Sequence, residues 1–215
     1  MGLIKQTQDS ASAAQLGKRG RGRDCASLCA ALDDSQALVR RWAARDLSDC
    51  GDSEDCVACR AALLQRLPKE AEPAVRAIIL STLQKLADAV VVQQLLDGLR
   101  TAEPGLCQEM IGTLQQLPQL VAPQVPRLLA DSDAALRILA VNILESLRHA
   151  EVEPWLLQVI AHDSDVNVCA AALDLLGEVG TQAARVPLQQ LKQRFAGEPY
   201  IAFAADLALR RLQQV

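Results

Sequence analysis

The chain has 215 residues, of which 50% are hydrophobic and only 2% aromatic. Its formal net charge of −4 at pH 7 argues against broad nucleic-acid binding, which requires a basic face. No apolar run approaches the roughly 18 residues that a membrane-spanning helix needs, and residues 1–24 lack the apolar core of a secretion signal. We therefore expect a cytoplasmic protein that binds neither nucleic acid nor a membrane.

The first 24 residues differ in charge from the rest of the chain. They contain five basic and two acidic side chains, a net charge of +3, which leaves −7 for the remainder. Gly17, Gly20 and Gly22 interrupt the basic stretch Lys18–Arg23, so residues 1–24 are predicted to be a flexible basic tail. Contact with an acidic partner is the alternative interpretation of this stretch.

A pattern then recurs along the chain at intervals of 30 to 36 residues. Each copy has an apolar anchor three residues after a helix start, followed by apolar residues at helical spacing. The anchors are Val39, Val75, Leu106, Leu136, Val168 and Ile201. The helix starts are Gln36, Glu72, Glu103, Asp133, Asp165 and Glu198. Five of these six starts are acidic, which favours a helix N-terminus, and a period of this length predicts a solenoid of stacked helical units.

A second helix is expected within each complete unit, near residues 54–67, 88–99, 120–129, 150–160 and 182–195. Pro123, Pro126 and Pro187 should shorten or kink these helices, and Gly180 fits the break before the last of them. The unit that starts at Glu198 has room for one helix only. The sequence thus predicts an all-α solenoid over residues 25–215, with about five helical hairpins and a C-terminal capping helix.

Three segments resemble a known repeat family. Residues Asp33–Leu47, Asp131–Arg137 and Asp163–Val168 each pass from an acidic turn to an anchor and are similar to HEAT-type units of the phycobilisome-lyase-like class. The resemblance implies a right-handed α–α superhelix whose second helices line the concave side. Relatives with such repeats attach or detach bilin chromophores, so bilin lyase-like activity is one function that the resemblance implies.

Arginine follows the anchor in only half of the units. It is present as Arg40, Arg76 and Arg137, whereas Cys107, Cys169 and Ala202 replace it in the others. A ladder of arginine and aspartate side chains along the stack is therefore expected to be incomplete.

The sharpest chemical signal is a cysteine cluster in the first unit. Five of the seven cysteines lie within 35 residues, namely Cys25, Cys29, Cys50, Cys56 and Cys59. Cys25 and Cys29 share one helix face, as do Cys56 and Cys59, and a turn at Cys50 can bring the two pairs together. Four thiolates in such a place would suit Zn²⁺ or an iron–sulfur cluster.

Two further interpretations of these cysteines remain open. Free cysteine is a common small core residue, so buried structural thiols that need no cofactor are the simplest explanation. Thiol redox sensing is the third interpretation, with Cys56 and Cys59 as the candidate pair. Cys107 and Cys169 each follow an anchor and are predicted to be structural.

No motif supports catalysis. The sequence contains no phosphate loop, His-Glu-x-x-His or Gly-x-Ser-x-Gly, and its two histidines, His149 and His162, are predicted to be exposed turn residues. We therefore do not predict an enzyme.

The predicted second helices are rich in glutamine, which suits hydrogen bonding to a protein partner. The candidate partner-binding residues are Gln93, Gln94, Gln124, Arg127, Gln158, Gln189 and Gln190. Trp155, which follows Pro154 at a helix start, is the candidate exposed anchor, whereas Trp42 is expected in the core. The sequence predicts a monomeric adaptor that binds another protein, with a metal- or cluster-binding accessory protein as the alternative.

Overall fold

The computed structural model describes residues 24–49 and 54–212, and every regular element in these ranges is helical. The predicted basic tail, apart from Asp24, and Cys50 lie outside the described residues. The chain forms two compact units, residues 1–82 and residues 83–215, with the boundary inside one helix. None of the described helices combines the length and the apolar character that crossing a membrane requires.

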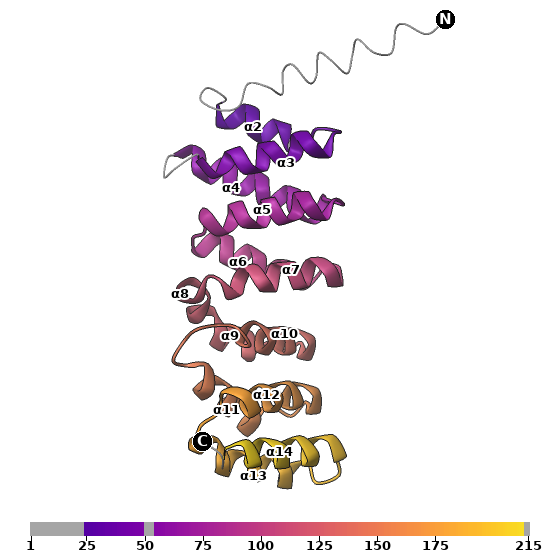
Figure 1. Ribbon diagram of the computed structural model, residues 1–215, viewed down its shortest axis with the longest axis vertical. Coiled ribbons are helices and arrows are strands. Elements are labelled where there is room, and N and C mark those ends of the chain that lie inside the picture. The colour runs from indigo at the N-terminus through magenta and orange to yellow at the C-terminus, as the bar shows by residue number, and fades with distance from the viewer. Residues whose placement is uncertain (1–23, 50–53, 213–215) are drawn as a thin grey trace, which may run out of the picture. The chain divides into compact units, whose positions relative to one another are not determined.

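Unit 1 begins with a short helix that precedes the first predicted anchor. Its elements are α2 (Cys25–Ala31), α3 (Ala37–Asp46), the 3-10 turn η1 (Leu47–Asp49), α4 (Glu54–Arg66), the 3-10 turn η2 (Leu67–Lys69) and α5 (Pro73–Lys85), which continues into unit 2. Helix α2 packs on both α3 and α4, as Figure 1 shows. Leu32, Leu47 and Leu63 are fully buried and form the core between these helices.

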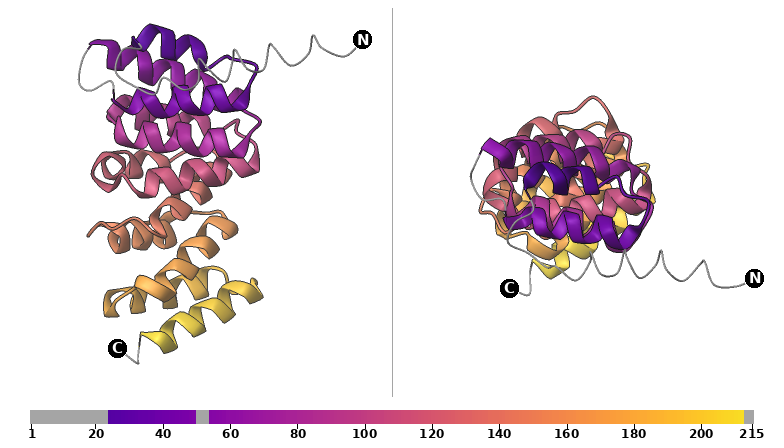
Figure 2. Two further views of the ribbon diagram at one scale, coloured as in Figure 1. Left: turned by 45° about the horizontal axis from the view of Figure 1, so that its top comes forward. Right: turned by 90° about the horizontal axis from the view of Figure 1, so that it is seen from above.

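Unit 2 contains the remaining repeats. Its elements are α6 (Ala89–Gly98), α7 (Pro104–Gln115), α8 (Pro118–Val121), η3 (Ala122–Gln124), α9 (Val125–Leu129), α10 (Ala134–Leu144), α11 (Val152–His162), α12 (Val166–Val179), η4 (Gln182–Ala184), α13 (Arg185–Arg194) and α14 (Pro199–Arg211). The first helices of successive repeats pack on one another in the order α7, α10, α12 and α14, and the second helix α11 packs on α13 (Figures 1 and 2). The predicted all-α repeat architecture is confirmed for the described residues.

The helix starts agree closely with the sequence pattern. Glu103, Asp133 and Asp165 are N-cap residues whose carboxylates accept hydrogen bonds from backbone N–H groups of the first turn, at 2.8–3.1 Å. The anchors that are at most 5% exposed are Val75, Leu106, Leu136, Val168 and Ile201. Val39, the first anchor, is only half-buried.

The prolines divide one second helix as expected. In the third repeat the segment is broken into α8, η3 and α9, with Pro123 in the 3-10 turn and Pro126 in the first turn of α9. A proline offers no N–H for a helical hydrogen bond, so the backbone tightens locally instead of continuing as one helix. Each piece is therefore short, and the turn that follows α9 lies beside the next second helix.

A buried ion pair holds the first two repeats of unit 1 together. Arg40, the residue after the first anchor, donates from Nε and Nη2 to the two carboxylate oxygens of Glu70, both at 2.7 Å. Its Nη1 donates to the carbonyl oxygens of Asp34 and Ser35 in the turn before α3, at 2.9 and 3.1 Å. The Glu70 side chain is fully buried, and the hydrogen bonds from Arg40 lower its pKa to about 2 despite this burial.

Replacing Glu70 by Gln should lower the free energy of unfolding by about 3 kcal/mol at neutral pH, because the Arg40 guanidinium stays buried without its charged partner. The folded-state pKa of Glu70 lies below its ordinary value of 4.5. Its contribution is therefore complete above that value and is lost as the pH falls toward 2. Urea unfolding followed by circular dichroism across this pH range measures the difference between wild type and variant.

Asp33→Asn is the matched control, since that carboxylate is 79% exposed and contacts Arg66 at 3.3 Å. It should change stability by less than about 0.5 kcal/mol. Equal losses for the two substitutions, or a Glu70→Gln loss that persists at low pH, would contradict the role given to this ion pair.

Gly180, which ends α12, should not tolerate a methyl group. A Cβ atom built there would lie 2.4 Å from the carbonyl oxygen of Leu176, which accepts the Gly180 N–H. Gly180→Ala should therefore lower the free energy of unfolding by about 1–3 kcal/mol, a cost typical of forced packing. Gly112→Ala, inside α7 and with open space around its Cβ position, should instead raise it by roughly 0.5–1 kcal/mol. Thermal unfolding of both variants measures these two changes. An increase in stability for Gly180→Ala would contradict the predicted clash with the Leu176 carbonyl.

Candidate functional site

A groove lies between the second helices α9 and α11 of unit 2. It has a volume of about 580 Å³ and is lined by Pro126, Leu129, Ala130, Asp131, Arg137, Gln158, Val159, His162, Asp163 and Ser164. The α9 side is apolar, whereas α11 contributes the polar side chains Gln158 and His162, both exposed. The groove thus has one apolar wall and one wall that can form hydrogen bonds.

An ion pair lines the groove beside these walls. Arg137 donates from Nε and Nη2 to the two carboxylate oxygens of Asp163, at 2.7 and 3.0 Å. Its Nη1 donates to the carbonyl oxygens of Asp131 and Ser132 in the turn before α10. Burial alone would raise the pKa of Asp163, but the hydrogen bonds from Arg137 and from the Asp165 N–H outweigh it and hold that pKa below its ordinary value. Asp163 therefore stays ionised beside Arg137, and these hydrogen bonds hold both side chains in position.

The Arg137 site repeats the construction seen at Arg40. Each arginine follows an anchor, donates to the carbonyls six and five residues before it, and binds a carboxylate of the next repeat in a bidentate manner. Each of those carboxylates, Glu70 and Asp163, also accepts the N–H of the residue two positions later. The expected ladder of arginine and carboxylate side chains is therefore present at Arg40 and at Arg137.

Where cysteine replaces the arginine, a guanidinium from another position supplies part of the missing contacts. The Cys169 thiol donates to the Asp163 carbonyl oxygen at 3.3 Å, and Arg194 of α13 donates to that oxygen at 3.0 Å and to the Ile160 carbonyl at 2.8 Å. In the repeat with Cys107, Arg100 forms the ion pair with Asp131 of the next turn. Sequence reasoning missed Arg100 and Arg194, because neither occupies the position after an anchor.

Most of the predicted partner-binding residues are accessible. Gln94, Arg127, Gln158, Gln189 and Gln190 are exposed, and Gln93 and Gln124 are half-buried. Arg127 of α9 donates to the side-chain oxygen of Gln93 at 3.2 Å, and Gln93 donates to Asp97 at 2.9 Å. These contacts join α6 and α9 into one polar surface. Of the predicted set, only Gln158 lines the groove itself.

The prediction that Trp155 is an exposed anchor is wrong. Its side chain is only 8% exposed and stacks on His149, with the ring centroids 5.2 Å apart and the planes 9° from parallel. Trp155 lies in the first turn of α11, on the side that packs inward, and the imidazole covers its outer face. His149 is correspondingly half-buried, and its Nδ1 accepts the Glu151 N–H at 3.2 Å.

Two other side chains also differ from expectation. His162 is exposed as predicted, but it is the last residue of α11 and lines the groove instead of standing in a turn. Trp42, expected in the core, is half-buried.

The cysteines of unit 1 divide between the interior and its edge. Cys56 and Cys59 are buried on α4, whereas Cys25 and Cys29 are half-buried on α2. Among the residues that the structure describes, no three His, Cys, Asp or Glu side chains are placed to hold a metal ion. Cys50 lies outside that part of the chain, so the five-cysteine metal or cluster site stays a prediction.

The comparison with known families agrees with the resemblance seen in the sequence. A family model described as HEAT repeats matches residues 25–115 and 121–209, so the chain belongs to the HEAT-repeat family. No curated protein matches its sequence.

Three solved structures are similar to the chain. The HEAT-like repeat protein of the archaeon Thermococcus onnurineus is 16% identical, with a TM-score of 0.46 and coverage of 96% of this chain and 92% of its own. Human deoxyhypusine hydroxylase in complex with glycerol is 18% identical, with a TM-score of 0.42 and coverage of 98% and 92%. The complex of CpcE and CpcF of phycocyanin lyase from Nostoc is 17% identical, with a TM-score of 0.38 and coverage of 91% and 97%. TM-scores this low give no basis for assigning any of these activities to the chain.

Trp155→Ala should lower the free energy of unfolding by about 3–5 kcal/mol, because it removes a large buried ring and leaves His149 without its stacking partner. Phe203→Ala on α14 is the aromatic control, since that ring is 62% exposed, and it should cost less than about 0.5 kcal/mol. Urea unfolding followed by circular dichroism compares the two. A small effect of Trp155→Ala would return Trp155 to the set of candidate surface anchors.

Proposed function

We propose that this protein is a non-catalytic adaptor, acting as a monomer in the cytoplasm, that binds a segment of another protein in the groove between α9 and α11. The observation that carries the proposal is the groove itself, which has an apolar wall, a hydrogen-bonding wall and an ion pair along its lining. Stacked helical repeats generally present such elongated surfaces to their partners.

The shape of the groove favours a polypeptide over a small molecule. Pro126, Ala130, Gln158, His162 and Ser164 line it and are all exposed, so it is open to solvent along its walls. A pocket for a small ligand usually encloses most of the ligand surface, whereas an open groove accommodates a chain that continues at both ends. Apolar side chains of a bound segment would contact α9, and its backbone groups would bind to α11.

The carboxylates in the groove are already engaged, which favours binding over catalysis. Asp163 is held by Arg137, and Asp131 accepts the Asp133 N–H at 2.9 Å while it pairs with Arg100. A general base must be free to accept a proton from a substrate, and ion pairing to arginine opposes protonation of both groups. The same contacts hold the lining in place before a partner arrives, which reduces the entropic cost of association.

A photoactivatable benzoylphenylalanine at position 158 should crosslink the partner in an extract of the source cells, and one at position 108 should not. Gln108 is an equally exposed glutamine, but it lies on the first helix α7. With the captured partner purified, Gln158→Ala should weaken its binding about tenfold, the value of one or two lost hydrogen bonds, while Gln108→Ala leaves it within about twofold. Isothermal titration calorimetry measures both affinities.

A second pair of variants tests the groove by filling it. Ala130→Arg introduces a long side chain into the groove and should abolish binding, whereas Ala135→Arg on α10 should not, because Ala135 is equally exposed outside the groove. Crosslinking of the same partner from both glutamine positions would overturn the proposal. So would full affinity in the Ala130→Arg chain.

A further inference from the structure

Two of the clustered cysteines of unit 1 lie on different helices that pack on each other. Helices α2 and α4 pack directly on each other, and the thiols of Cys29 on α2 and Cys59 on α4 are close enough to interact. Neither residue forms a disulfide. Cys25, one turn before Cys29, is close enough to influence the Cys29 thiol electrostatically. Three of the five clustered cysteines thus gather where α2 meets α4.

The two thiols differ in accessibility. Cys59 is completely buried at 0% exposure, whereas Cys29 is half-buried at the edge of the contact. The pair favoured by the sequence, Cys56 and Cys59, lies on one helix and is buried at both positions, so neither member can meet an oxidant first. The Cys29–Cys59 pair has both requirements of a dithiol switch, a reachable thiol and a second thiol in contact with it.

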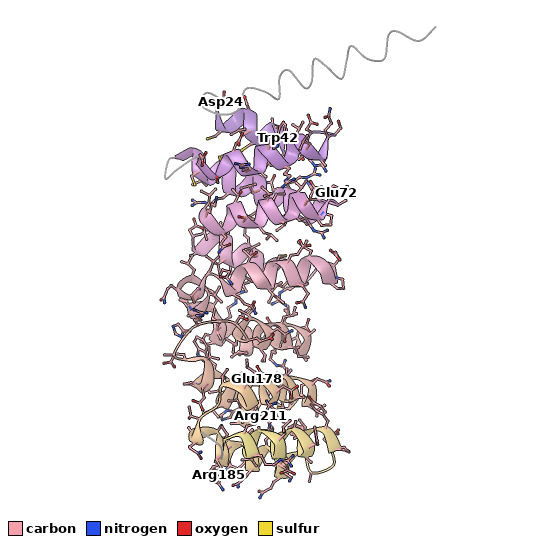
Figure 3. All side chains as sticks on the ribbon, viewed as in Figure 1. Asp24, Trp42, Glu72, Glu178, Arg185 and Arg211 are labelled. Carbon is pink, nitrogen blue, oxygen red and sulfur yellow. The ribbon has the colours of Figure 1, made fainter. Side chains whose placement is uncertain are left out.

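Helix α2 depends on its neighbours for stability. It has seven residues, far fewer than an isolated helix needs in water, and within it only Leu28 is buried. Asp24, labelled in Figure 3, precedes this helix and caps its N-terminus. Its carboxylate accepts the Ser27 N–H at 2.7 Å. A covalent bond from α2 to α4 would therefore change the stability of this short helix more than that of a longer one.

We propose that Cys29 and Cys59 form an intramolecular disulfide when the protein meets a hydroperoxide, and that this bond fastens α2 onto α4. The Cys29 sulfur, as thiolate, attacks the outer peroxide oxygen, which gives a Cys29 sulfenic acid and releases the alcohol, or water when the oxidant is hydrogen peroxide. The Cys59 sulfur then attacks the Cys29 sulfur, forms the S–S bond and expels water. Two thiols and one hydroperoxide thus become one disulfide, one alcohol and one water, and the peroxide oxygen takes up both electrons.

The surroundings of Cys29 also set the pace of the first step. Burial raises the pKa of the Cys29 thiol, the interaction with the Cys59 thiol opposes this, and Cys25 adds to the increase. Most of the sulfur is therefore protonated at neutral pH, and the first step should be slow compared with that of a dedicated peroxidase. Because this step is slow, the Cys29–Cys59 pair should be oxidised only when the hydroperoxide persists.

The test treats the reduced full-length chain with hydrogen peroxide, alkylates the remaining thiols and maps disulfides by mass spectrometry without reduction. The expected result is one intramolecular bond, between Cys29 and Cys59. Cys29→Ser and Cys59→Ser should abolish it, while Cys56→Ser, on the same helix as Cys59, and Cys25→Ser should retain it. Cys59→Ala replaces Cys59→Ser if the buried hydroxyl prevents folding, as judged by circular dichroism, and Cys29→Ser tests the same bond at a half-buried position.

Amide hydrogen exchange reports the structural consequence. In the oxidised chain, exchange in residues 25–32 should slow at least tenfold, while exchange in α12 of unit 2 stays unchanged. The Cys29→Ser chain treated in the same way should show no slowing.

Several outcomes would overturn the inference. These are a disulfide between any other two cysteines, a bond between two chains, accumulation of sulfinic acid at Cys29 without a disulfide, or unchanged exchange in α2. Tight binding of zinc or iron by the reduced chain that protects both thiols from peroxide would also overturn it, in favour of the predicted metal site. Because the bond lies in unit 1 and the partner-binding groove in unit 2, none of these outcomes decides the adaptor proposal.

Discussion

The stacking of these repeats depends on a guanidinium held in the turn before α3 and again in the turn before α10. Arg40 illustrates the constraint, because its guanidinium donates both to two carbonyl oxygens of its own turn and to the carboxylate of Glu70 in the next repeat. A buried charge of either sign is costly alone, so neither residue can be satisfied unless the two repeats approach at one separation. The carboxylate also accepts the Glu72 N–H, which fixes the start of the next helix. Turn, helix start and repeat spacing are thus determined together.

The same turn is supported even where the arginine is missing. Beside Cys169, the carbonyl oxygen of Asp163 accepts from the thiol and from Arg194, which approaches from a different helix. The requirement lies with the turn carbonyls, which need hydrogen-bond donors, and more than one sequence position can supply these donors. In unit 2 this support has a second consequence. Arg137 and Asp163 line the candidate groove, so the contacts that stack the repeats also shape the surface proposed to bind a partner.

Features that depend on local chemistry could be predicted from the sequence. Features that depend on which face of a helix packs inward could not. Asp133 and Asp165 cap helices because a carboxylate at a helix start can accept the N–H groups of the first turn. Pro123 breaks a second helix because it lacks an N–H. The burial of Trp155 was missed because proline before tryptophan marks a helix start without indicating which side of α11 packs inward. Helical spacing likewise placed Cys25 and Cys29 on one face, but only the packing of α2 on α4 decides that Cys29 meets Cys59.

The position of the thiol pair determines what its oxidation can do. Repeat proteins pass stability between neighbouring units, and local opening starts at elements with few buried side chains, such as α2. Helix α2 contacts α3 and α4, so holding it in place acts first on α3, whose N-terminal turn contains Arg40 and its contacts to Glu70. A disulfide at Cys29 would therefore suppress opening of α2 and protect the buried ion pair between Arg40 and Glu70. The expected effect of oxidation is thus a longer-lived folded state of unit 1, with the chemistry of the groove in unit 2 left unchanged.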